Sequence, residues 1–476
     1  MSEKRKYDIT IGIECHVQLK TKTKLFSEVD NDARGKEPNS CVSPVDYALP
    51  GMLPRLNGEA VKLAIRAGAA MNAKINPESR FDRKHYFYPD SPKGYQITQF
   101  YHPIVGEGYV ELPSGKKIRI EHAHLEGDAG KLTHFDTYSL VDLNRVDTPL
   151  LEIVSMPDIS SPEEARDYCK ELWRNMVYAG VTNGDLYNGN MRFDVNISLK
   201  KPSDKRLGTR AEIKNLNSFR SIERAAAYEY ERQSKLLDKG EKVIQETRGW
   251  SDATGVTTGQ RSKEEAQDYR YMPEPDLPPL NLSDEFIKIE YDKCPALPAD
   301  YRTRFAKIIP ADTLEVLLDY PELAKRLAEI ADNNQPVDYV ANLFASVLLA
   351  EENQSLLNDT LPSASQLIEL SNMKAKNELS STSAKEVFIK LFEPKHCDKS
   401  PLELAKELNL VQENDSGALE AIVDAVLAKP ETAKAQADYK AGQEKVLGFL
   451  VGQVMKESHG KANPSAVSEI LKKKLK

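Results

Sequence analysis

Residues 7–19 read YDITIGIECHVQL, and their strict alternation decides the fold of the N-terminal part of the chain. The apolar residues fall on every second position, at Ile9, Ile11, Ile13, Cys15, Val17 and Leu19. Alternate side chains of a strand point to opposite faces, so a period of two predicts a β-strand with one face on a core. The other face of this strand is expected to be polar and open.

That open face would carry Glu14 and His16, which stand two residues apart. A carboxylate oxygen and an imidazole nitrogen are both common ligands of divalent metal ions. The first strand therefore already predicts a metal site.

Composition limits the classes of protein to which the chain can belong. Its 476 residues predict two to four domains. The net charge of -8 argues against a protein that coats nucleic acid with its whole surface, although it allows a local basic patch. The five cysteines form no CxxC pair, so we expect a reducing, cytoplasmic environment. No apolar run reaches the roughly 18 residues that span a bilayer, and only a few residues precede the first strand, so we expect neither a membrane span nor a leader peptide.

Three further segments, 118–126, 191–199 and 209–217, show the same alternation. Their polar positions carry imidazoles, carboxylates, amides and cations, at His122, His124, Glu126, Arg192, Asp194, Asn196, Glu212 and Lys214. We therefore expect a mostly antiparallel sheet that presents one chemically rich face.

The period of two makes two detailed predictions about these faces. It places Ile118 and Ile120 on the face of His122, and it places Asn215 and Asn217 opposite Lys214.

A solvated outer face is the simpler interpretation of any one of these strands. It weakens when four strands share the pattern, because an ordinary outer face is richer in Lys, Glu and Thr than in His, Asp and Asn. Such a cluster suits Mg²⁺ with a nucleotide, since this ion takes one or two carboxylates and leaves other positions to phosphate and water. The sequence contains no P-loop and no GxGxxG motif, so we expect neither a P-loop nor a Rossmann nucleotide site.

The chain is expected to divide into three domains. These are an α+β catalytic domain at 1–293, an all-α domain at 294–400 and a small all-α tail at 401–476. Strand patterns stop at the proline-containing loop 294–298, and the polar stretch 393–400 separates the two helical parts.

Two helix starts are predicted by capping boxes. They pair Ser161 with Glu164 and Ser383 with Glu386, and Gly180 should end the first of these helices.

Residues 81–99 read FDRKHYFYPDSPKGYQITQ and predict a fixed loop between prolines. Aromatic side chains interleaved with cations can stack on unpaired bases and neutralise phosphate. A tyrosine-rich packing loop is the alternative interpretation.

Eight motifs, in this order along the chain, carry a family resemblance: IGIECHVQL, FDRKHYFYPDSPKGYQITQF, HLEGDAGK, YSLVDLNRVDTPLLEIVSMPDI, MRFDVNISL, GTRAEIKNLNSF, DYRYMPEPDLPPL and GFLVGQVMKESHGKANP. Together they resemble the GatB family, the B subunits of bacterial aspartyl/glutamyl-tRNA(Asn/Gln) amidotransferases. The resemblance extends from about residue 7 to the end of the chain.

This resemblance implies a catalytic cradle domain similar in fold to glutamine synthetase, followed by a helical domain and a helical tail. It implies a glutamine-hydrolysing, ATP-dependent ligase that converts Glu-tRNA(Gln), Asp-tRNA(Asn) or both to the amidated forms. The B subunit would phosphorylate the tRNA-bound carboxylate with Mg²⁺ and ATP. Ammonia from an A subunit would then displace the phosphate, within a heterotrimer of A, B and C subunits.

The resemblance also assigns roles to residues. Glu14, His16 and Glu126 match metal-binding positions, and Asp194 and Glu212 are expected to be further catalytic residues. Many relatives have a second glutamate at the position of Gly127, so that ligand is missing here or is supplied by Asp128 or water.

The aminoacylated 3′ end of the tRNA is expected to meet Arg83, Lys84, Tyr86, Tyr88, Lys93, Tyr95, Gln96, Asn215, Asn217 and Ser218. Some relatives bind zinc through cysteines near Cys41, and a lone cysteine cannot do this, so no zinc is expected.

The C-terminal end of this acidic chain is basic. Lys440, Lys445, Lys456 and Lys461 are expected to bind tRNA phosphates. Three alternatives remain at this point: a non-catalytic tRNA-binding scaffold, the longer archaeal Glu-specific paralogue, and a small-molecule carboxylate kinase.

Overall fold

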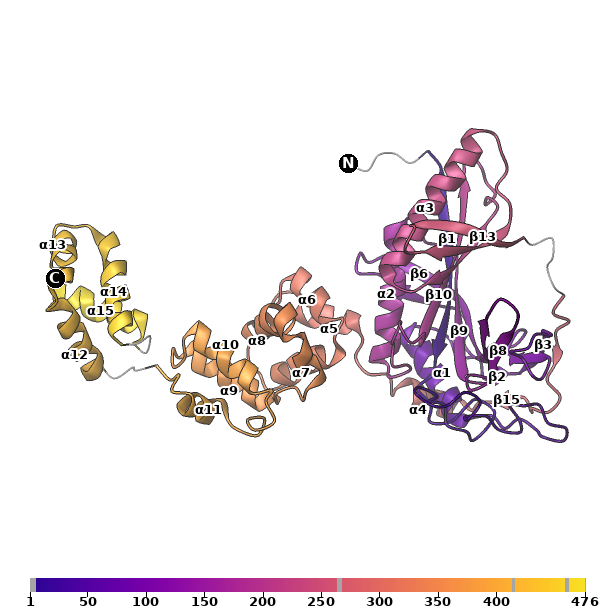
Figure 1. The fold of residues 1–476 in the computed structure, drawn as a ribbon, viewed down its shortest axis with the longest axis horizontal. Coiled ribbons are helices and arrows are strands. Elements are labelled where there is room, and N and C mark those ends of the chain that lie inside the picture. Colours follow the sequence, from indigo (N-terminus) through magenta and orange to yellow (C-terminus); the bar gives the residue numbers. More distant parts are fainter. Residues whose placement is uncertain (1–5, 263–267, 413–415, 459–461, 476) are drawn as a thin grey trace. The chain divides into compact units, whose positions relative to one another are not determined.

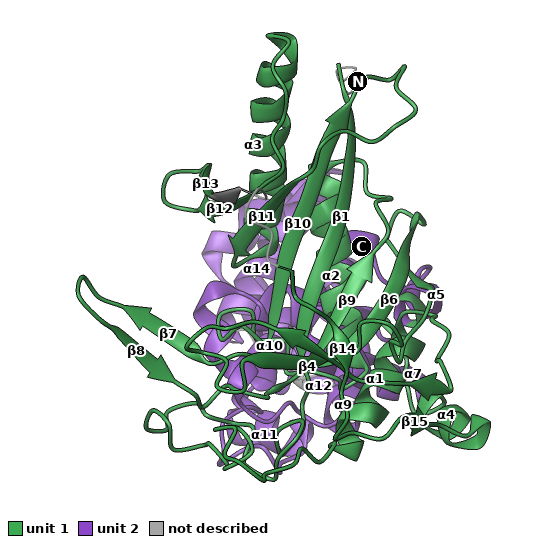
Figure 2. Cartoon of the chain, turned by 90° about the vertical axis from the view of Figure 1, so that its right-hand side faces the viewer, with its two compact units in different colours: residues 1–300 green, residues 301–476 purple. Residues whose placement is uncertain are grey.

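The computed structural model describes residues 6–262, 268–412, 416–458 and 462–475. The chain forms two compact units, Met1–Asp300 and Tyr301–Lys476 (Figure 2). Every described strand lies in the first unit, whereas the described part of the second unit is helical. The expected α+β class is confirmed.

The first unit is built on an eight-stranded sheet (Figure 1). From one edge to the other its strands are β13 (Val256–Ser262), β12 (Glu246–Ser251), β11 (Ala211–Leu216), β10 (Met191–Lys200), β1 (Asp8–Gln18), β9 (Pro149–Ser155), β6 (Lys117–Gly127) and β5 (Gly108–Glu111). Each described pairing in this sheet is antiparallel except that of β11 with β12. The expected mostly antiparallel sheet is therefore confirmed, with β1 in its interior.

Three small sheets complete the strands of this unit. They join β3 (Asp82–His85) to β4 (Tyr95–Thr98) and β14 (Met272–Pro273), β2 (Glu78–Ser79) to β15 (Leu280–Asn281), and β7 (Lys131–His134) to β8 (Ser139–Asp142). The hairpin of β7 and β8 projects from the first unit in Figure 2.

The core of the first unit lies between one face of the sheet and the helices α1 (Gly58–Ala70), α2 (Pro162–Tyr178) and α3 (Phe219–Asp238). Residues Ile11, Ile13 and Cys15 of β1 are fully buried in it, and the residues between them are partly exposed. Full burial of one such aliphatic side chain contributes about 1.5–3 kcal/mol. The burial of β1 thus follows the period of two, and its polar residues are left for a site.

Helix α2 begins and ends where the sequence predicts, with one difference. Ser161 accepts a hydrogen bond from the backbone N–H of Glu164 (3.1 Å), and Gly180 follows the helix with a φ of +68°. The Glu164 carboxylate, however, accepts from the backbone N–H of Ser160 (2.8 Å) and not from that of Ser161. The predicted capping box is therefore only half formed.

The predicted start at Ser383 is wrong. Helix α10 (Ser381–Lys390) begins one turn earlier, because Ser380 is its N-cap and accepts from the backbone N–H of Ser383 (3.0 Å). Residues 380–383 read SSTS, so several neighbouring hydroxyls offer the same cap and the local sequence does not select one. The burial of Leu379, just before the cap, depends on tertiary packing.

Helix α4 (Asp284–Tyr291) ends the first unit, and α5 (Pro298–Phe305) crosses the boundary at residue 300. The other helices of the second unit are α6 (Ala311–Leu317), α7 (Pro321–Asp332), α8 (Asp338–Leu343), α9 (Ala364–Ala375), α10, α11 (Pro401–Glu407), α12 (Ser416–Leu427), α13 (Ala433–Lys440), α14 (Leu447–Glu457) and α15 (Pro464–Leu475). A π-helical turn lies at Phe344–Leu348, and 3-10 helices lie at Glu351–Asn358, Pro430–Thr432 and Glu444–Val446. None of the helices in the described ranges is long and apolar enough to cross a membrane.

The expected boundary at residue 401 lies just before α11. This helix packs against α9 and α10 and buries Leu404. Helices α12, α14 and α15 share a separate hydrophobic cluster that includes Leu419, Leu450 and Leu471. The three-domain division stays a prediction. A domain boundary placed after α11 would keep its contacts with α9 and α10, whereas a boundary before α11 would divide them.

Substitution of Ser380 and of Ser383 tests which of the two residues caps α10. We expect Ser380→Ala to weaken the helix start by about 1 kcal/mol, which speeds amide hydrogen exchange in its first turn about fivefold. Ser383→Ala is the matched control and should change the rate little, since alanine is a good helix former at that position. Hydrogen exchange in the full chain measures both, and the reverse order of effects would contradict the observed helix start.

Candidate active site on the polar face of the sheet

The polar face of β1 carries two acidic clusters rather than one. Glu14 lies opposite Asp194 of β10, whereas His16 lies opposite Glu152 of β9. The two residues share a face, but each finds its acidic neighbour on a different side of β1. The expected ligands Glu14, His16 and Glu126 are therefore divided between two sets.

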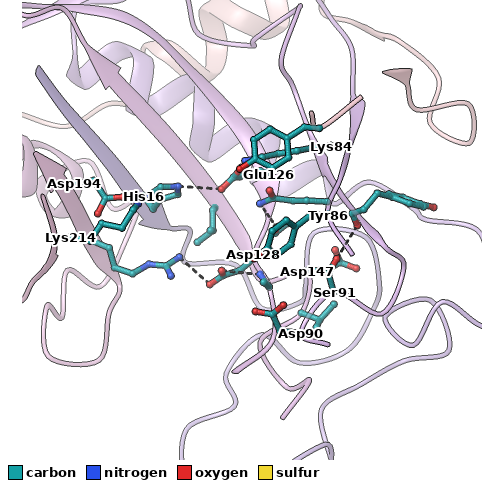
Figure 3. A pocket seen from close by; sticks show the side chains of 18 of the residues that line it. His16, Lys84, Tyr86, Asp90, Ser91, Glu126, Asp128, Asp147, Asp194 and Lys214 are labelled. Atoms are coloured by element: carbon teal, nitrogen blue, oxygen red, sulfur yellow. Dashed lines mark hydrogen bonds and ion pairs between the residues drawn. The ribbon is translucent and has the colours of Figure 1, made fainter. Parts of the chain in front are cut away.

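The first cluster joins His16 to Glu126 and Glu152. The His16 Nε2 atom is 3.4 Å from Glu126 Oε1 (Figure 3). The same atom is 3.6 Å from Glu152 Oε2. His124 Nε2 approaches the same Glu152 oxygen at 3.2 Å. One ligand atom from each of His16, Glu126 and Glu152 lies within 4.8 Å of the others, which is close enough to share a metal ion.

The charge of His124 and the charges of its neighbouring carboxylates stabilise one another in this cluster. Burial alone would lower the pKa of His124, but hydrogen bonds to Glu126 and Glu152 outweigh it and raise that pKa to about 9. Burial would raise the pKa of Glu152, but His124 outweighs it and holds that pKa well below its usual range. In the absence of a metal, His124 is thus the counter-charge of the two carboxylates.

The second cluster joins Glu14, Asp194 and Glu212 across β1, β10 and β11. Their carboxylate oxygens again lie within 4.8 Å of one another. Lys214 neutralises two of them, with its Nζ atom 2.7 Å from Asp194 and 2.9 Å from Glu212. Asn196 donates to Glu14 at 2.9 Å. Burial, followed by the neighbouring carboxylates, raises the pKa of Glu14.

Donor chemistry separates the two sets. The all-oxygen set of Glu14, Asp194 and Glu212 fits Mg²⁺, which prefers oxygen ligands. The set of His16, Glu126 and Glu152 adds one imidazole, which first-row transition metals also accept. Both sets lie on the polar face that the sequence predicts.

A β-bulge at Glu121 re-aims the end of β6. The pairs Ile120–Ser155 and His122–Val154 leave Glu121 as an extra residue. Ile118 and Ile120 therefore point into the core, and His122 points to the polar face. The prediction that they share a face is wrong for this reason.

A second irregularity re-aims the end of β11. Its register against β10 shifts after Ile213, and Asn215 adopts the left-handed φ of +65°. As a result Asn215 and Asn217 line the same pocket as Lys214. The prediction that they lie on the opposite face is wrong.

A pocket opens beside the first cluster, between the sheet and the loop that joins β3 to β4 (Figure 3). Seven of the ten residues expected to meet the tRNA 3′ end line it: Lys84, Tyr86, Lys93, Tyr95, Gln96, Asn215 and Asn217. Its wall therefore combines cations, aromatic rings and amides with the carboxylates of the polar face.

The other three expected residues have different surroundings. Arg83 forms a two-pronged ion pair with the buried Glu274, at 2.8 and 2.9 Å. Tyr88 is 45 % exposed and packs against Tyr86, with 5.6 Å between ring centroids. Ser218 caps helix α3. Of these three, Arg83 and Ser218 have structural partners, whereas Tyr88 is accessible.

Asp128 is absent from both clusters. Its carboxylate lies between two arginines, 3.2 Å from Arg145 Nε and 3.1 Å from the Arg192 guanidinium. Asp128, which was expected to be a metal ligand, therefore forms ion pairs with two arginines. Residue 127 belongs to neither cluster.

Strand periodicity alone did not point to Glu152, which belongs to the first cluster. A signal was present, since Glu152 is the lone charged residue in the apolar strand 149–155, PLLEIVS. It also missed Lys214 as the counter-charge of the second cluster, which depends on the register of β10 and β11.

Comparisons with known proteins identify the family that this chain resembles. A family described as GatB/GatE catalytic domain matches residues 9–288, and one described as GatB domain matches residues 307–475. The chain is 42 % identical over 484 residues to the B subunit of the aspartyl/glutamyl-tRNA(Asn/Gln) amidotransferase of Thermotoga maritima. The B subunits of the same enzyme from Carboxydothermus hydrogenoformans and a Geobacter species are 43 % and 44 % identical. Each of these alignments covers 99 % of both chains.

The second cluster predicts a response to metal ions. We expect Lys214→Met to lower the free energy of unfolding in metal-free buffer by about 1 kcal/mol, a modest loss because solvent screens a side chain that is 39 % exposed. Mg²⁺ should then raise the melting temperature more in the variant than in the wild type, since the ion replaces the lost charge. Lys117→Met, at an exposed lysine of β6, is the control. Equal Mg²⁺ responses in all three proteins would argue against a cation site here.

Proposed function

The chain belongs to the GatB family, and we propose that it is the B subunit of an ATP-dependent, glutamine-hydrolysing tRNA amidotransferase. Its substrate would be Glu-tRNA(Gln), Asp-tRNA(Asn) or both, as the names of its relatives indicate. The observation that carries the proposal is the meeting of two acidic clusters with a cationic and aromatic pocket on one face of the sheet.

The reaction needs activation because a carboxylate is a poor acyl donor at neutral pH. Transfer of the γ-phosphoryl group of ATP to a carboxylate oxygen supplies a leaving group. Ammonia then attacks the carbonyl carbon, the bond to the phosphorylated oxygen breaks, and inorganic phosphate leaves. Catalysis of such a transfer consists mainly of positioning and of charge stabilisation.

In this proposal Glu14, Asp194 and Glu212 would hold Mg²⁺, and His16, Glu126 and Glu152 would hold a second divalent ion. When bound, the ions would neutralise phosphate oxygens and stabilise the charge of the transferred group. Both sets are built from side chains on neighbouring strands, so their spacing is fixed by the sheet.

Cations around the clusters would hold the reacting carboxylate and phosphate. Burial tends to lower the pKa of Lys84, but Glu126, Tyr271 and Glu152 outweigh it and raise that pKa, so the side chain stays charged. Arg192 is likewise charged and lines the pocket. These groups supply positive charge where negative charge gathers in the transition state.

The 3′ end of the tRNA would enter along the loop between β3 and β4. Tyr86, Tyr95 and Gln96 line the pocket, and the exposed rings of Phe87 and Tyr88 lie on the same loop. Exposed aromatic rings suit the unpaired bases of the acceptor end, since base stacking needs a free ring face.

The nitrogen would come from a partner. Burial raises the pKa of the thiols of Cys15 and Cys169 well above its usual range, so neither suits the attack on glutamine. We expect an A subunit to hydrolyse glutamine and a C subunit to complete the heterotrimer, because the relatives are named as B subunits of an amidotransferase.

The alternative of a non-catalytic scaffold rested on Gly127. Because neither acidic cluster involves position 127, this substitution does not speak against catalysis.

Glu14 offers a test of the proposed metal site, because it is partly exposed and can lose its charge with little change of volume. We expect Glu14→Gln to lower tRNA-dependent ATP turnover by about two orders of magnitude or more, because metal charge stabilisation contributes several kcal/mol. The melting temperature should change little. Glu126→Gln is a less clean variant, since Glu126 is only 3 % exposed.

Glu111→Gln on the edge strand β5 is the control, because Glu111 is exposed and pairs only with Lys117 among the ion pairs of the described residues. Turnover is measured against Mg²⁺ concentration with misacylated tRNA. Wild-type turnover in Glu14→Gln would refute the proposed site.

The lysines of the C-terminal tail offer a test of tRNA binding. Lys440, Lys445 and Lys456 are exposed, and Lys461 lies outside the described residues. We expect the triple variant with alanine at the three described positions to bind tRNA more weakly. The slope of log affinity against log salt should become shallower by roughly 2–3, since each lost phosphate contact contributes about 0.7–0.9. The measurement uses the assembled complex, and its tRNA-independent glutaminase activity is the control. An unchanged slope would leave the tail with a structural role.

A further inference from the structure

Gly127 ends β6 at a place where another side chain fills its space. A Cβ atom at this position would lie 2.5 Å from Asp147 Oδ1 and 3.3 Å from Asp147 Cα. Real Cβ contacts are not this short, so any larger residue would have to displace the Asp147 carboxylate. Positions 127 and 147 therefore accommodate only one side chain in their present geometry.

Asp147 is held firmly in an unfavourable backbone conformation. Its φ is +58°, a left-handed value that is uncommon for residues other than glycine, asparagine and aspartate. Its N–H donates to Asp128 O (2.9 Å), and its carbonyl accepts from Leu25 N–H (2.9 Å). Such a conformation persists only where contacts of the residue stabilise it. The side chain of Asp147 adds to the two backbone hydrogen bonds.

That side chain makes an ion pair with Lys93 in the pocket wall. The side chains of Asp147 and Lys93 are 6 % and 8 % exposed, and both residues line the pocket. Figure 3 labels Asp147 in this wall. The Lys93 ammonium also lies 5.6 Å from the centroid of the Phe26 ring. A long, flexible lysine is thus fixed in one place by a carboxylate behind it and a ring beside it.

We propose that Asp147 is a positioning residue that fixes Lys93 for binding of the aminoacylated tRNA end, and that Gly127 is required because the Asp147 carboxylate occupies the space of its missing side chain. The first half of this inference rests on the proposed function, because that function assigns the pocket to the tRNA end. The second half is independent of it.

The physical basis is preorganisation. A free lysine has many rotamers and loses them when it binds a ligand, which weakens binding. Asp147 orders Lys93 before the substrate arrives, so the entropy loss is part of folding and not of binding. The effect should appear in the KM for tRNA and leave the phosphoryl transfer itself unchanged.

The steric half is tested by a double-mutant cycle of thermal unfolding with the full chain. We expect both single variants to lower the melting temperature: Gly127→Ala because its Cβ meets the Asp147 carboxylate, and Asp147→Gly because the buried Lys93 loses its partner. In the Asp147→Gly background, Gly127→Ala should lower the melting temperature much less than it does in the wild type, because the carboxylate that blocks the new Cβ is gone. Additive losses would overturn the coupling between the two positions.

The positioning half is tested by steady-state kinetics of the assembled complex. Asp147→Asn keeps the volume and removes the charge. We expect the KM for misacylated tRNA to rise about two- to tenfold, which corresponds to the ordering of one side chain, with kcat and the KM for ATP unchanged. In a Lys93→Met background, Asp147→Asn should have no further effect on KM, since Asp147 acts through Lys93.

Asp46→Asn is the matched control. Asp46 forms another fully buried ion pair, with Lys24 (3.1 Å), and is not among the residues that line the pocket. We expect this variant to lose stability without a change in KM. If Asp147→Asn behaves like Asp46→Asn, or still raises KM in the Lys93→Met background, the positioning role is wrong. If the wild type shows no tRNA-dependent ATP turnover, the proposed function fails instead, and the unfolding cycle still decides the steric half.

Discussion

The register of β1 between its two neighbours is the constraint on which the site depends. One face of β1 is fixed on the core by its buried Ile11, Ile13 and Cys15, so a slip by one residue would bury Glu14 and His16 instead. The same register places Glu14 opposite Asp194 and His16 opposite Glu152. The hydrophobic core therefore sets the spacing of groups that would repel one another in isolation.

Such a concentration of carboxylates is stable only because cations balance it. Lys214 bridges Asp194 and Glu212, and His124, whose pKa is raised to about 9, lies between Glu126 and Glu152. Removal of His124 would leave buried carboxylates without a partner, which is costly in a medium of low dielectric constant. Removal of the partly exposed Lys214 should cost less, because solvent screens it. Each cluster thus has a built-in counter-charge, and this property distinguishes it from an ordinary acidic surface.

Much of this could be predicted from the sequence, because a period of two reports burial directly. The alternation of residues 7–19 gave the face of every residue in β1, and the motif of residues 191–199 did the same for β10. The predictions failed where the backbone departs from the regular period, at the bulge beside His122 and at the left-handed Asn215. They also could not divide the ligands into two sets, since strand order and register are long-range properties. Glu152 was overlooked although its isolated charge in an apolar strand marks it.

The central claim is that this protein activates the tRNA-bound carboxylate as an acyl phosphate, and an oxygen isotope label tests it most directly. Glu-tRNA(Gln), or Asp-tRNA(Asn), with heavy oxygen in both side-chain carboxylate positions is converted by the assembled complex with unlabelled ATP and ammonium ions. Attack of the carboxylate on the γ-phosphorus keeps its carbon–oxygen bond, and ammonia later breaks that bond. The account predicts that one labelled oxygen appears in the released inorganic phosphate for each amide formed. Amide formation with unlabelled phosphate would contradict it.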